Sequence, residues 1–319
     1  MSFQDIKPIQ KPEFYIDLAF KRANKKAAEK RKKVAKKSKL AKAKYLEPIK
    51  IDIIKDILSS AVESIVKDFP DIEELPAFYK ELTKITVGTY ELKKALSNLY
   101  WIKNKIKEFS KQYKSKIAKS PALAVLSKQK TEFYGRISSL FKRAKSNLIF
   151  LENARKTFKQ FPIVKTKLPT IAIAGFPNVG KSTLLGKLSL SKPEVAVYPF
   201  TTKGIMIGYF QTDKNKIQLL DTPGTLNRID KMNMIELQAW LALKYLAQKI
   251  IYIFDLTEPF PLVSQEELYK RIKQFQKPVI IYLSKTDMIE KGKINKFKNK
   301  YKKTITDIKE LKKLLNKNT

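Results

Sequence analysis

The chain has 319 residues, 43% of them hydrophobic, which is enough to bury a core in one large domain or two moderate ones. Its 66 Lys and Arg against 30 Asp and Glu give a formal net charge of +36, which favours an anionic partner, nucleic acid first, because each neutralised phosphate releases counterions. The absence of Cys and His excludes disulfides, thiol redox chemistry and His-based catalysis, so any bound metal should be a hard, oxygen-ligated ion such as Mg2+.

Two features bear on membranes and location. The sequence contains no run of eighteen apolar residues, so no membrane span is expected. The N-terminal segment MSFQDIKPIQ lacks the apolar core of a signal peptide, which favours a cytoplasmic protein.

The nine glycines divide the chain into two parts of different character. Only Gly88 and Gly135 precede residue 170, whereas the other seven lie between residues 175 and 292. Few glycines mean few tight turns and long helices, and the glycine-bearing part should alternate strands, loops and helices. We therefore expect a helical-bundle domain over residues 1–165 and an α/β domain over residues 166–319.

Lysine and arginine are concentrated near the start of the predicted helical domain. Residues 21–44 contain thirteen of them against one acid, Glu29. A solvated helix face is one interpretation of this run, and a generally Lys-rich composition is another. An RNA-binding arm is favoured, because charge this one-sided has no partners for internal salt bridges.

The apolar spacing of the first part predicts helices throughout. Apolar residues recur at steps of three and four over residues 92–117 and again over 133–158, which indicates two long antiparallel helices. Pro121 is well placed to begin the second. The aromatic residues Tyr45, Tyr100, Trp101 and Tyr113 could stack on bases, but core or rim positions are favoured for each. Shorter helices are expected at 12–30, 48–67 and 75–84.

From residue 170 onward, short apolar runs alternate with helical patterns. Continuous apolar strands of this kind indicate a mostly parallel sheet covered by helices on both faces. The runs are residues 171–174, 217–220, 250–254 and 279–283.

The segment GFPNVGKS at residues 175–182 matches the phosphate-binding pattern G-x-x-x-x-G-K-[ST], directly after a predicted strand and before a predicted helix. Backbone amides at the helix start are expected to bind the β-phosphate, with the Lys181 ammonium on the β- and γ-phosphates and the Ser182 hydroxyl on Mg2+. The predicted nucleotide contacts here are Gly175, Asn178, Val179, Gly180, Lys181, Ser182 and Thr183.

Two further segments complete the predicted phosphate site. DTPG at residues 221–224 follows an apolar strand, so Asp221 is expected to hold Mg2+ and the Gly224 amide to meet the γ-phosphate. In YPFTT at residues 198–202, Thr202 is favoured over Thr201 as a Mg2+ ligand that orders its loop around the triphosphate. The predicted Mg2+ ligands are thus Ser182, Thr202 and Asp221.

The segment Ser284-Lys285-Thr286-Asp287 follows the last predicted strand and should bind the base. The carboxylate of Asp287 can accept both hydrogens that guanine presents at N1 and N2, and adenine offers no such pair. The stem of Lys285 can pack over the face of the base. These residues favour GTP over ATP as the nucleotide.

Taken together, these motifs resemble the G domain of Ras-like GTPases. The exact residues within the motifs are similar to those of the Obg-related GTPases. The closest resemblance is to the Nog1 (nucleolar GTP-binding protein) family in an archaeal-length form, and it covers nearly the whole chain. Outside the nucleotide motifs it is carried by DFPDI at 68–72, PAFY at 76–79 and NMIELQA at 233–239. The resemblance implies a GTPase that binds large-subunit rRNA or a pre-ribosomal particle, alongside other assembly factors, and switches conformation during assembly.

Three departures from the family pattern affect these expectations. Ser284 stands where Asn is most common, which removes an amide that braces the phosphate loop. The Ser-Ala loop that reads guanine O6 is not spelled out, and residues 304–306 are a poor candidate for it. The chain ends soon after the G domain, so functions of the long extension of eukaryotic relatives are not expected.

Hydrolysis is expected to be slow. Thr225 follows Gly224 where many GTPases have a water-positioning Gln, and no His is present as a base. Asn178 suggests potassium, or else the ribosomal particle, as the group that completes the site; the alternative is that Asn178 only shapes its loop. The residues expected to act in catalysis are Lys181, Thr202, Gly224 and Asn178. For Asp255, loop hydrogen bonding or a surface role is favoured over catalysis.

Alternative functions stay open at this point. One is an rRNA-binding assembly scaffold that binds nucleotide with negligible turnover. Another is an Obg-like GTPase of translation or stress signalling, against which the glycine-poor helical part argues. An ATPase is the remaining nucleotide alternative, and Asp287 argues against it.

Overall fold

The computed structural model describes residues 3–190, 194–196, 205–213, 215–222, 239–257 and 260–317. The chain forms two compact units, one made of residues 1–74 and 83–159 and the other of residues 75–82 and 160–319. Residues 75–82 and 160–165, which lie within the predicted helical domain, therefore cluster with the second unit. The fold class is the expected one, a helical bundle followed by an α/β domain whose sheet is mostly parallel and covered by helices.

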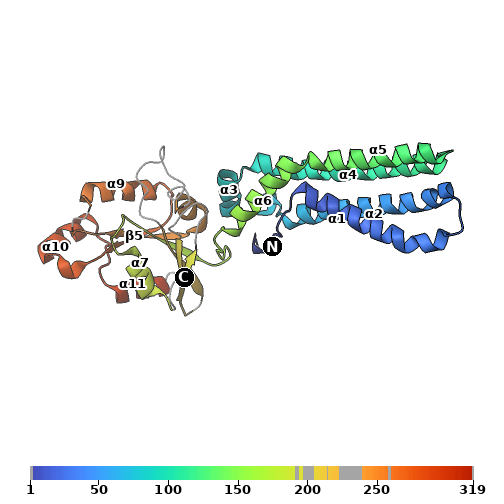
Figure 1. Ribbon diagram of the computed structural model, residues 1–319. Helices are drawn as coiled ribbons and strands as arrows, with labels where there is room; N and C mark the ends of the chain where they lie inside the picture. The colour runs from blue at the N-terminus through green and yellow to red at the C-terminus, as the bar shows by residue number, and fades with distance from the viewer. Residues whose placement is uncertain are drawn as a thin grey trace. The chain divides into compact units, whose positions relative to one another are not determined.

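Long helices build the first unit (Figure 1). Helix α1 packs on α2, α2 on α4, and α4 on α5, so that consecutive long helices lie side by side. The helices are α1 (Pro12–Arg31), α2 (Lys39–Asp68), α4 (Thr89–Lys119), α5 (Leu123–Lys142) and α6 (Lys145–Lys159); α3 (Ala77–Thr86) begins in the second unit and ends in the first.

The apolar stripe predicted over residues 92–117 is the buried face of α4. Leu92, Leu99, Ile106 and Tyr113 are almost fully buried there, as expected for residues that recur every three or four positions on one face of a helix. Tyr113 is thus a core residue. Trp101 and Tyr100, on the same helix, are about half exposed.

The second long helix that the sequence predicted is two helices. Helix α5 ends at Lys142 and α6 begins at Lys145, although the apolar period continues across the break. Pro121 does not begin α5, because Ala122 is the N-cap and the helix starts at Leu123. The apolar residues recur at steps of three and four on both sides of the break, because each helix buries one face. The periodicity of the sequence therefore does not reveal where α5 ends and α6 begins.

Helix α2 begins nine residues before the predicted start at residue 48. The Ser38 hydroxyl accepts a hydrogen bond from the Ala41 amide at 3.2 Å and caps the helix. Pro48 lies inside the helix, so it removes one backbone donor without ending it. The basic run 21–44 therefore occupies the end of α1, the start of α2 and the connection between them.

The second unit is built on a six-stranded sheet of order β2-β3-β4-β1-β5-β6. The predicted strands are β1 (Thr170–Ala174), β4 (Lys216–Asp221), β5 (Lys249–Phe254) and β6 (Val279–Leu283), and they are parallel to one another. Two strands that the sequence analysis missed, β2 (Glu194–Ala196) and β3 (Ile205–Gln211), add an antiparallel edge. The sheet is thus mixed, with a parallel centre.

Helices cover both faces of this sheet. In Figure 1, α9 (Leu262–Lys273) lies on one side, and α7 (Lys181–Leu188) and α11 (Ile308–Lys317) lie on the other. Every residue of β1 is buried, because a central parallel strand has both faces covered. Other helical elements among the described residues are α10 (Lys291–Lys300), the π-helix Ala242–Leu246 and the 3-10 helix Thr286–Met288.

The position of β1 in the sheet locates the binding crevice. It lies between β4 and β5 at the centre of the strand order, and the loop at its carboxyl end leads into α7. Ligands of open α/β sheets bind beyond the carboxyl ends of the strands at such a point. Within the described part of the chain, no helix is long and apolar enough to cross a membrane.

Candidate nucleotide-binding site

The loop 175–180 connects β1 to α7 by way of two conformationally demanding glycines. Gly175 has a φ of +151°, and a Cβ at this position would lie 2.7 Å from the backbone oxygen of Ile253. Gly180 has left-handed backbone angles and precedes α7 without any side-chain cap. The first amides of α7 are therefore free of a capping side chain, which is the arrangement that binds a phosphate.

Lys181 is held against this loop. Its side chain is buried, and Nζ donates a hydrogen bond to the backbone oxygen of Phe176 at 2.7 Å. Burial lowers the pKa of Lys181, and the nearby carboxylate of Asp221 opposes that change. The ammonium group is thus placed inside the loop that would surround a phosphate.

Ser182 and Asp221 meet directly. The Ser182 hydroxyl donates a hydrogen bond of 2.5 Å to Oδ2 of Asp221, which ends β4. Burial raises the pKa of Asp221, while the Ser182 hydrogen bond and the Lys181 charge lower it. Thr222 fixes the following turn by donating through its amide and its hydroxyl to the backbone oxygen of Ile173.

The second carboxylate oxygen of Asp221 indicates what this pair could hold. Oδ1 is buried and has no hydrogen-bond partner among the described residues. An unpaired buried acceptor beside a hydroxyl oxygen matches the hard oxygen donors that Mg2+ prefers. The residues present therefore fit a magnesium ion. Thr202 and Gly224, the other predicted phosphate-site residues, lie outside the described residues.

The base-binding segment begins directly after β6. Lys285 has left-handed backbone angles, and its Nζ lies 2.6 Å from Oδ2 of Asp255, which follows β5. The other oxygen of Asp255 accepts hydrogen bonds from the amide and the hydroxyl of Thr257. Burial alone would raise the pKa of Asp255, but Lys285 and Thr257 hold it below its usual value.

Sequence reasoning had assigned Asp255 only a loop or surface role. Its hydrogen bonds from Thr257 agree with the expected loop role. Its ion pair with Lys285 was not expected and links it to the base-binding segment. The ion pair follows from strand pairing, which the sequence analysis did not consider. Phe254 of β5 aligns with Leu283 of β6, so Asp255 lies next to the base-binding segment. Gln265, which is fully buried, exchanges hydrogen bonds with the backbone of Asp255 and holds this corner in place.

Ser284 and Asp287 differ in how they are engaged. Ser284 lies near the phosphate loop, where a Cβ added to Gly180 would be 3.8 Å from its own Cβ. Its hydroxyl nevertheless donates to the backbone oxygen of Phe254 at 3.1 Å, so it braces β5. Asp287 is exposed and has no side-chain hydrogen bond or ion pair with any residue that the structure describes, which leaves its carboxylate available to a base.

Residues 304–306 are placed by backbone pairing with β6. Ile305 pairs in parallel with Tyr282, and its backbone exchanges hydrogen bonds of 2.9 Å with Ile281 and Leu283. Thr306 and Asp307 therefore follow β6 along the same edge as the segment 284–287. The sequence analysis considered this segment a poor base-reading loop because it lacks the Ser-Ala residues of the family pattern. Its placement depends on backbone pairing, which that pattern does not report.

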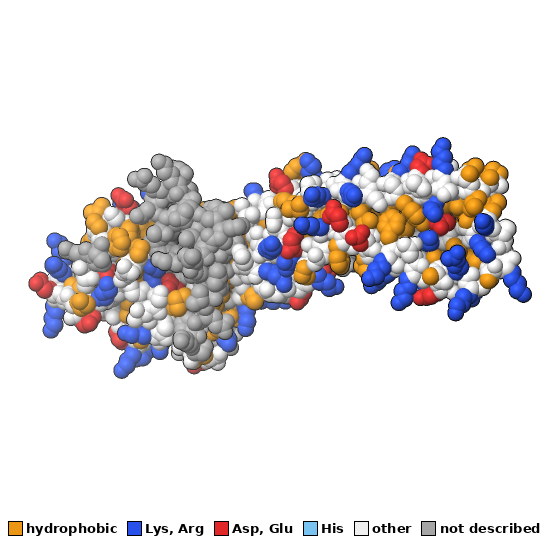
Figure 2. Space-filling model, viewed as in Figure 1, with side chains coloured by type: hydrophobic (Ala, Val, Ile, Leu, Met, Phe, Trp, Pro, Cys, Tyr) orange, Lys and Arg blue, Asp and Glu red, His pale blue; other side chains and the backbone are white. Residues whose placement is uncertain are grey.

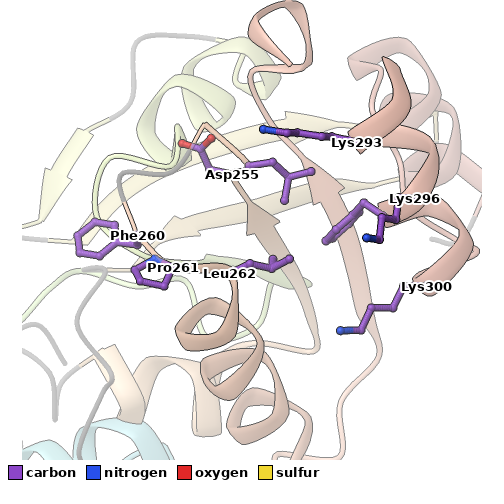
Figure 3. A pocket seen from close by; sticks show the side chains of 9 residues that line it. Asp255, Phe260, Pro261, Leu262, Lys293, Lys296 and Lys300 are labelled. Atoms are coloured by element: carbon purple, nitrogen blue, oxygen red, sulfur yellow. The ribbon is translucent and has the colours of Figure 1, made fainter. Parts of the chain in front are cut away.

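A cavity of 610 Å3 lies beside Asp255, between the start of α9 and α10 (Figure 3). Lys293, Lys296 and Lys300 line it from α10, and Phe260, Pro261 and Leu262 come from the segment that opens α9. Asp255, the ion-pair partner of Lys285, thus lines the cavity, and the ring of the lining residue Phe260 lies 4.9 Å from that of Phe176 in the phosphate loop.

Two family models match the chain. Residues 3–165 match the NOG1 N-terminal helical domain, and residues 170–285 match a model described as a 50S ribosome-binding GTPase. The matched ranges include the basic run, the segments of the phosphate site, and Ser284 and Lys285 of the base-binding segment, whereas Asp287 lies beyond the second match.

Individual proteins match over similar ranges. An uncharacterized protein of Methanocaldococcus jannaschii is 35% identical over 92% of this chain and 83% of its own length. Nucleolar GTP-binding protein 1 of Drosophila melanogaster is 28% identical over 90% of this chain, which spans less than half of that protein, 44%. A crystal structure described as a nucleolar GTP-binding protein 1 of Plasmodium falciparum is 30% identical, covers 40% of this chain and 65% of that one, and has a TM-score of 0.35.

Proposed function

The chain belongs to the Nog1 family of GTPases, and on that premise we propose that it hydrolyses GTP to GDP and phosphate as a conformational switch in large ribosomal subunit biogenesis. Its partners are large-subunit rRNA or a pre-ribosomal particle, together with other assembly factors, and its place of action is the cytoplasm. The family models support this proposal, because one describes a ribosome-binding GTPase and the other is the Nog1 helical domain.

The nucleotide part of the proposal is carried by the contact between Ser182 and Asp221 at the uncapped start of α7. The ammonium of Lys181 lies inside the loop, where it donates a hydrogen bond to the backbone oxygen of Phe176. With nucleotide bound, it would donate to the β- and γ-phosphates instead. Ser182 and Asp221 would hold Mg2+, which supplies charge neutralisation when bound. Asp287, two residues after Lys285 in the base-binding segment, would select guanine.

Slow turnover follows from the side chains that this chain lacks. No Gln follows Gly224, and the whole chain has no His, so the attacking water has no evident side chain to orient it. Asn178 is exposed and has a positive φ of 62°. This position in the phosphate loop supports the proposal that Asn178 helps hold a potassium ion near the phosphates. Thr202 and Gly224, which lie outside the described residues, are proposed to sense the γ-phosphate on sequence grounds alone.

The rRNA part rests on charge in the first unit. Most of the thirteen cations in residues 21–44 are exposed, and the acid among them, Glu29, pairs with Lys26 at 2.9 Å. Figure 2 shows Lys and Arg side chains spread over the visible face of both units. A run of cations with one internal partner attracts a polyanion strongly, with affinity that falls as salt rises.

The competing function is an rRNA-binding scaffold with negligible turnover, which the missing Gln favours. Single-turnover hydrolysis of bound GTP, with and without purified large-subunit particles, separates the two. The switch predicts a rate increase with particles, and a further increase in potassium over sodium. If no hydrolysis is detected under any of these conditions, the scaffold function is supported and the switch is refuted. Equal hydrolysis rates in potassium and sodium would refute the proposed role of Asn178 in binding potassium.

Two binding measurements complete the test. GTP should compete for bound GDP far better than ATP does, which an ATPase or an unspecific site would contradict. Replacing the lysines within residues 25–38 by Gln should weaken rRNA binding and flatten its salt dependence while leaving GDP affinity intact. The matched control replaces the same number of lysines on α10 and α11, where little effect on rRNA binding is expected.

A further inference from the structure

A groove of 560 Å3 lies between α4 and α5, away from the basic run at residues 21–44. Its volume is in the range of about 300–1,000 Å3 in which proteins bind small ligands. Three of its residues are cationic and two are aromatic, and no acidic side chain lines it in the described structure. The lining residues are Trp101, Lys105 and Phe109 of α4, Gly135, Arg136, Ser139 and Leu140 of α5, and Arg143, the C-cap residue directly after α5.

The residue spacing makes this a continuous groove and not an accidental gap. Trp101, Lys105 and Phe109 recur every four residues, so they form one row along α4. Gly135 and Ser139 of α5 and the C-cap residue Arg143 form the facing row. The rings of Tyr113 and Phe133 lie 5.6 Å apart and set the antiparallel register, which places Trp101 at the end of the groove where Arg143 lies.

Gly135 has no structural reason to be glycine. It lies inside α5, where glycine destabilises a helix relative to alanine. Its φ is not in the left-handed range, and a Cβ added to it would meet no atom within 4 Å. The absent side chain therefore relieves no internal clash, and its effect is to keep the groove open.

The charges around Trp101 are available to an anion. Arg143 makes no ion pair with any residue that the structure describes. Lys105 pairs with Glu108 at 2.7 Å and Arg136 with Glu132 at 2.9 Å. All of these pairs are solvent-accessible contacts within one helix, which contribute little and are readily exchanged for a phosphate. Trp101 is 50% exposed, so one face of its indole can receive a planar group.

We propose that this groove binds a single unstacked nucleotide of RNA, with its base stacked on Trp101 and its phosphate between Lys105 and Arg143. This inference rests on the proposed binding of rRNA and adds a specific site to it. A base in an aromatic groove with cations at the rim is the usual way that proteins recognise unpaired RNA. An acidic peptide could satisfy the cations as well, but the half-exposed indole and the space beside Gly135 favour a flat base.

The test uses the full chain carrying Trp240→Phe, which leaves Trp101 as the one tryptophan. Decauridylate and decaadenylate are titrated at physiological salt while the fluorescence of Trp101 is followed. Stacking should quench the emission, and Trp101→Ala, measured by anisotropy of labelled RNA, should weaken binding roughly tenfold or more. Tyr100→Ala is the matched control, because Tyr100 is 52% exposed on the same helix and does not line the groove.

A second variant tests the open space beside Gly135 and leaves the indole ring of Trp101 unchanged. Gly135→Leu should block the groove and reduce quenching and affinity as Trp101→Ala does, while Gly135→Ala should keep both and raise the melting temperature. If RNA binds but Trp101→Ala and Gly135→Leu change nothing, the groove is not a nucleotide site, while the rRNA proposal stands. If a polyglutamate peptide quenches Trp101 and RNA does not, the occupant is a protein segment and the inference is overturned. If no RNA binds even at low salt, the proposed rRNA binding is refuted, and the nucleotide site that rests on it is refuted with it.

Discussion

Asp255 and Lys285 form an ion pair that joins the end of one strand to the segment that follows the next. Oδ2 of Asp255 lies 2.6 Å from Nζ of Lys285, and the Asp255 side chain is fully buried. Thr257 and Gln265 fix Asp255 in turn. The lysine expected to pack on the base is therefore oriented by a carboxylate that does not itself need to touch the nucleotide.

Replacing Asp255 by Asn should weaken GDP binding about tenfold. Lys285 would lose its charged partner in this ion pair, and a tenfold loss corresponds to about 1.4 kcal/mol of binding free energy. Calorimetric titration with GDP measures the effect. Glu267→Gln, an exposed acid on α9, should bind GDP normally. An unchanged GDP affinity in Asp255→Asn would show that Lys285 needs no such partner.

Replacing Ser182 by Ala should uncouple nucleotide binding from magnesium. The hydroxyl donates to Asp221 at 2.5 Å and is the predicted Mg2+ ligand of α7. The gain in GTP affinity on adding Mg2+ should shrink about tenfold or more, since one of few oxygen ligands is lost. Titrating Mg2+ at fixed GTP measures this gain. Thr183→Ala, at the exposed neighbouring position, should keep it, and equal Mg2+ responses in the two variants would refute the assignment.

Lys277 should matter for stability although it is not one of the predicted site residues. Its Nζ donates to the backbone oxygens of Leu243 and Lys244, each at 2.7 Å, and to that of Ala247, at the end of the π-helix Ala242–Leu246. Burial lowers the pKa of Lys277. Lys277→Met keeps the aliphatic stem but leaves these oxygens without their donor, at a cost of roughly 1–3 kcal/mol.

Thermal unfolding followed by circular dichroism should therefore show a lower melting temperature for Lys277→Met, by several degrees. Lys270→Met, an exposed position on α9, is the control and should unfold with the parent protein. Identical melting curves for Lys277→Met and the parent would mean that water replaces the ammonium without loss.

Glu152 should contribute stability that depends on pH. It accepts hydrogen bonds from Nε and Nη2 of Arg155 and from the amide of Ile9, which ties the N-terminal segment to α6. The Arg155 bonds hold the pKa of Glu152 below its usual 4.5. A carboxyl group with a lowered pKa stabilises the fold above its unfolded pKa, and this stabilisation is lost as pH falls through the folded value.

Glu152→Gln should therefore lower the free energy of unfolding by about 1–3 kcal/mol at neutral pH, and the difference from the parent should shrink below pH 4.5. Urea unfolding at a series of pH values measures it. Glu29→Gln removes only an exposed pair with Lys26 and should cost little at any pH. A difference between Glu152→Gln and the parent that stays constant down to acid pH would assign the effect to packing.

The sequence by itself determined the fold class and the places where a nucleotide would be bound. A glycine-bearing loop between an apolar strand and a helix is specified by neighbouring residues, so GFPNVGKS could be located without a structure, and β1 and α7 do flank it. The apolar stripe of α4 was equally local, because a helix repeats its buried face every three or four residues.

Only the tertiary structure decided which distant residues meet. The pairing of Asp255 with Lys285 depends on β5 lying beside β6, and the position of Thr306 depends on a backbone pairing between Ile305 and Tyr282. The break between α5 and α6 leaves the apolar period intact, so no local pattern marks it. Periodicity and short motifs report contacts within a few residues, whereas contacts between strands and helices depend on packing across the whole unit.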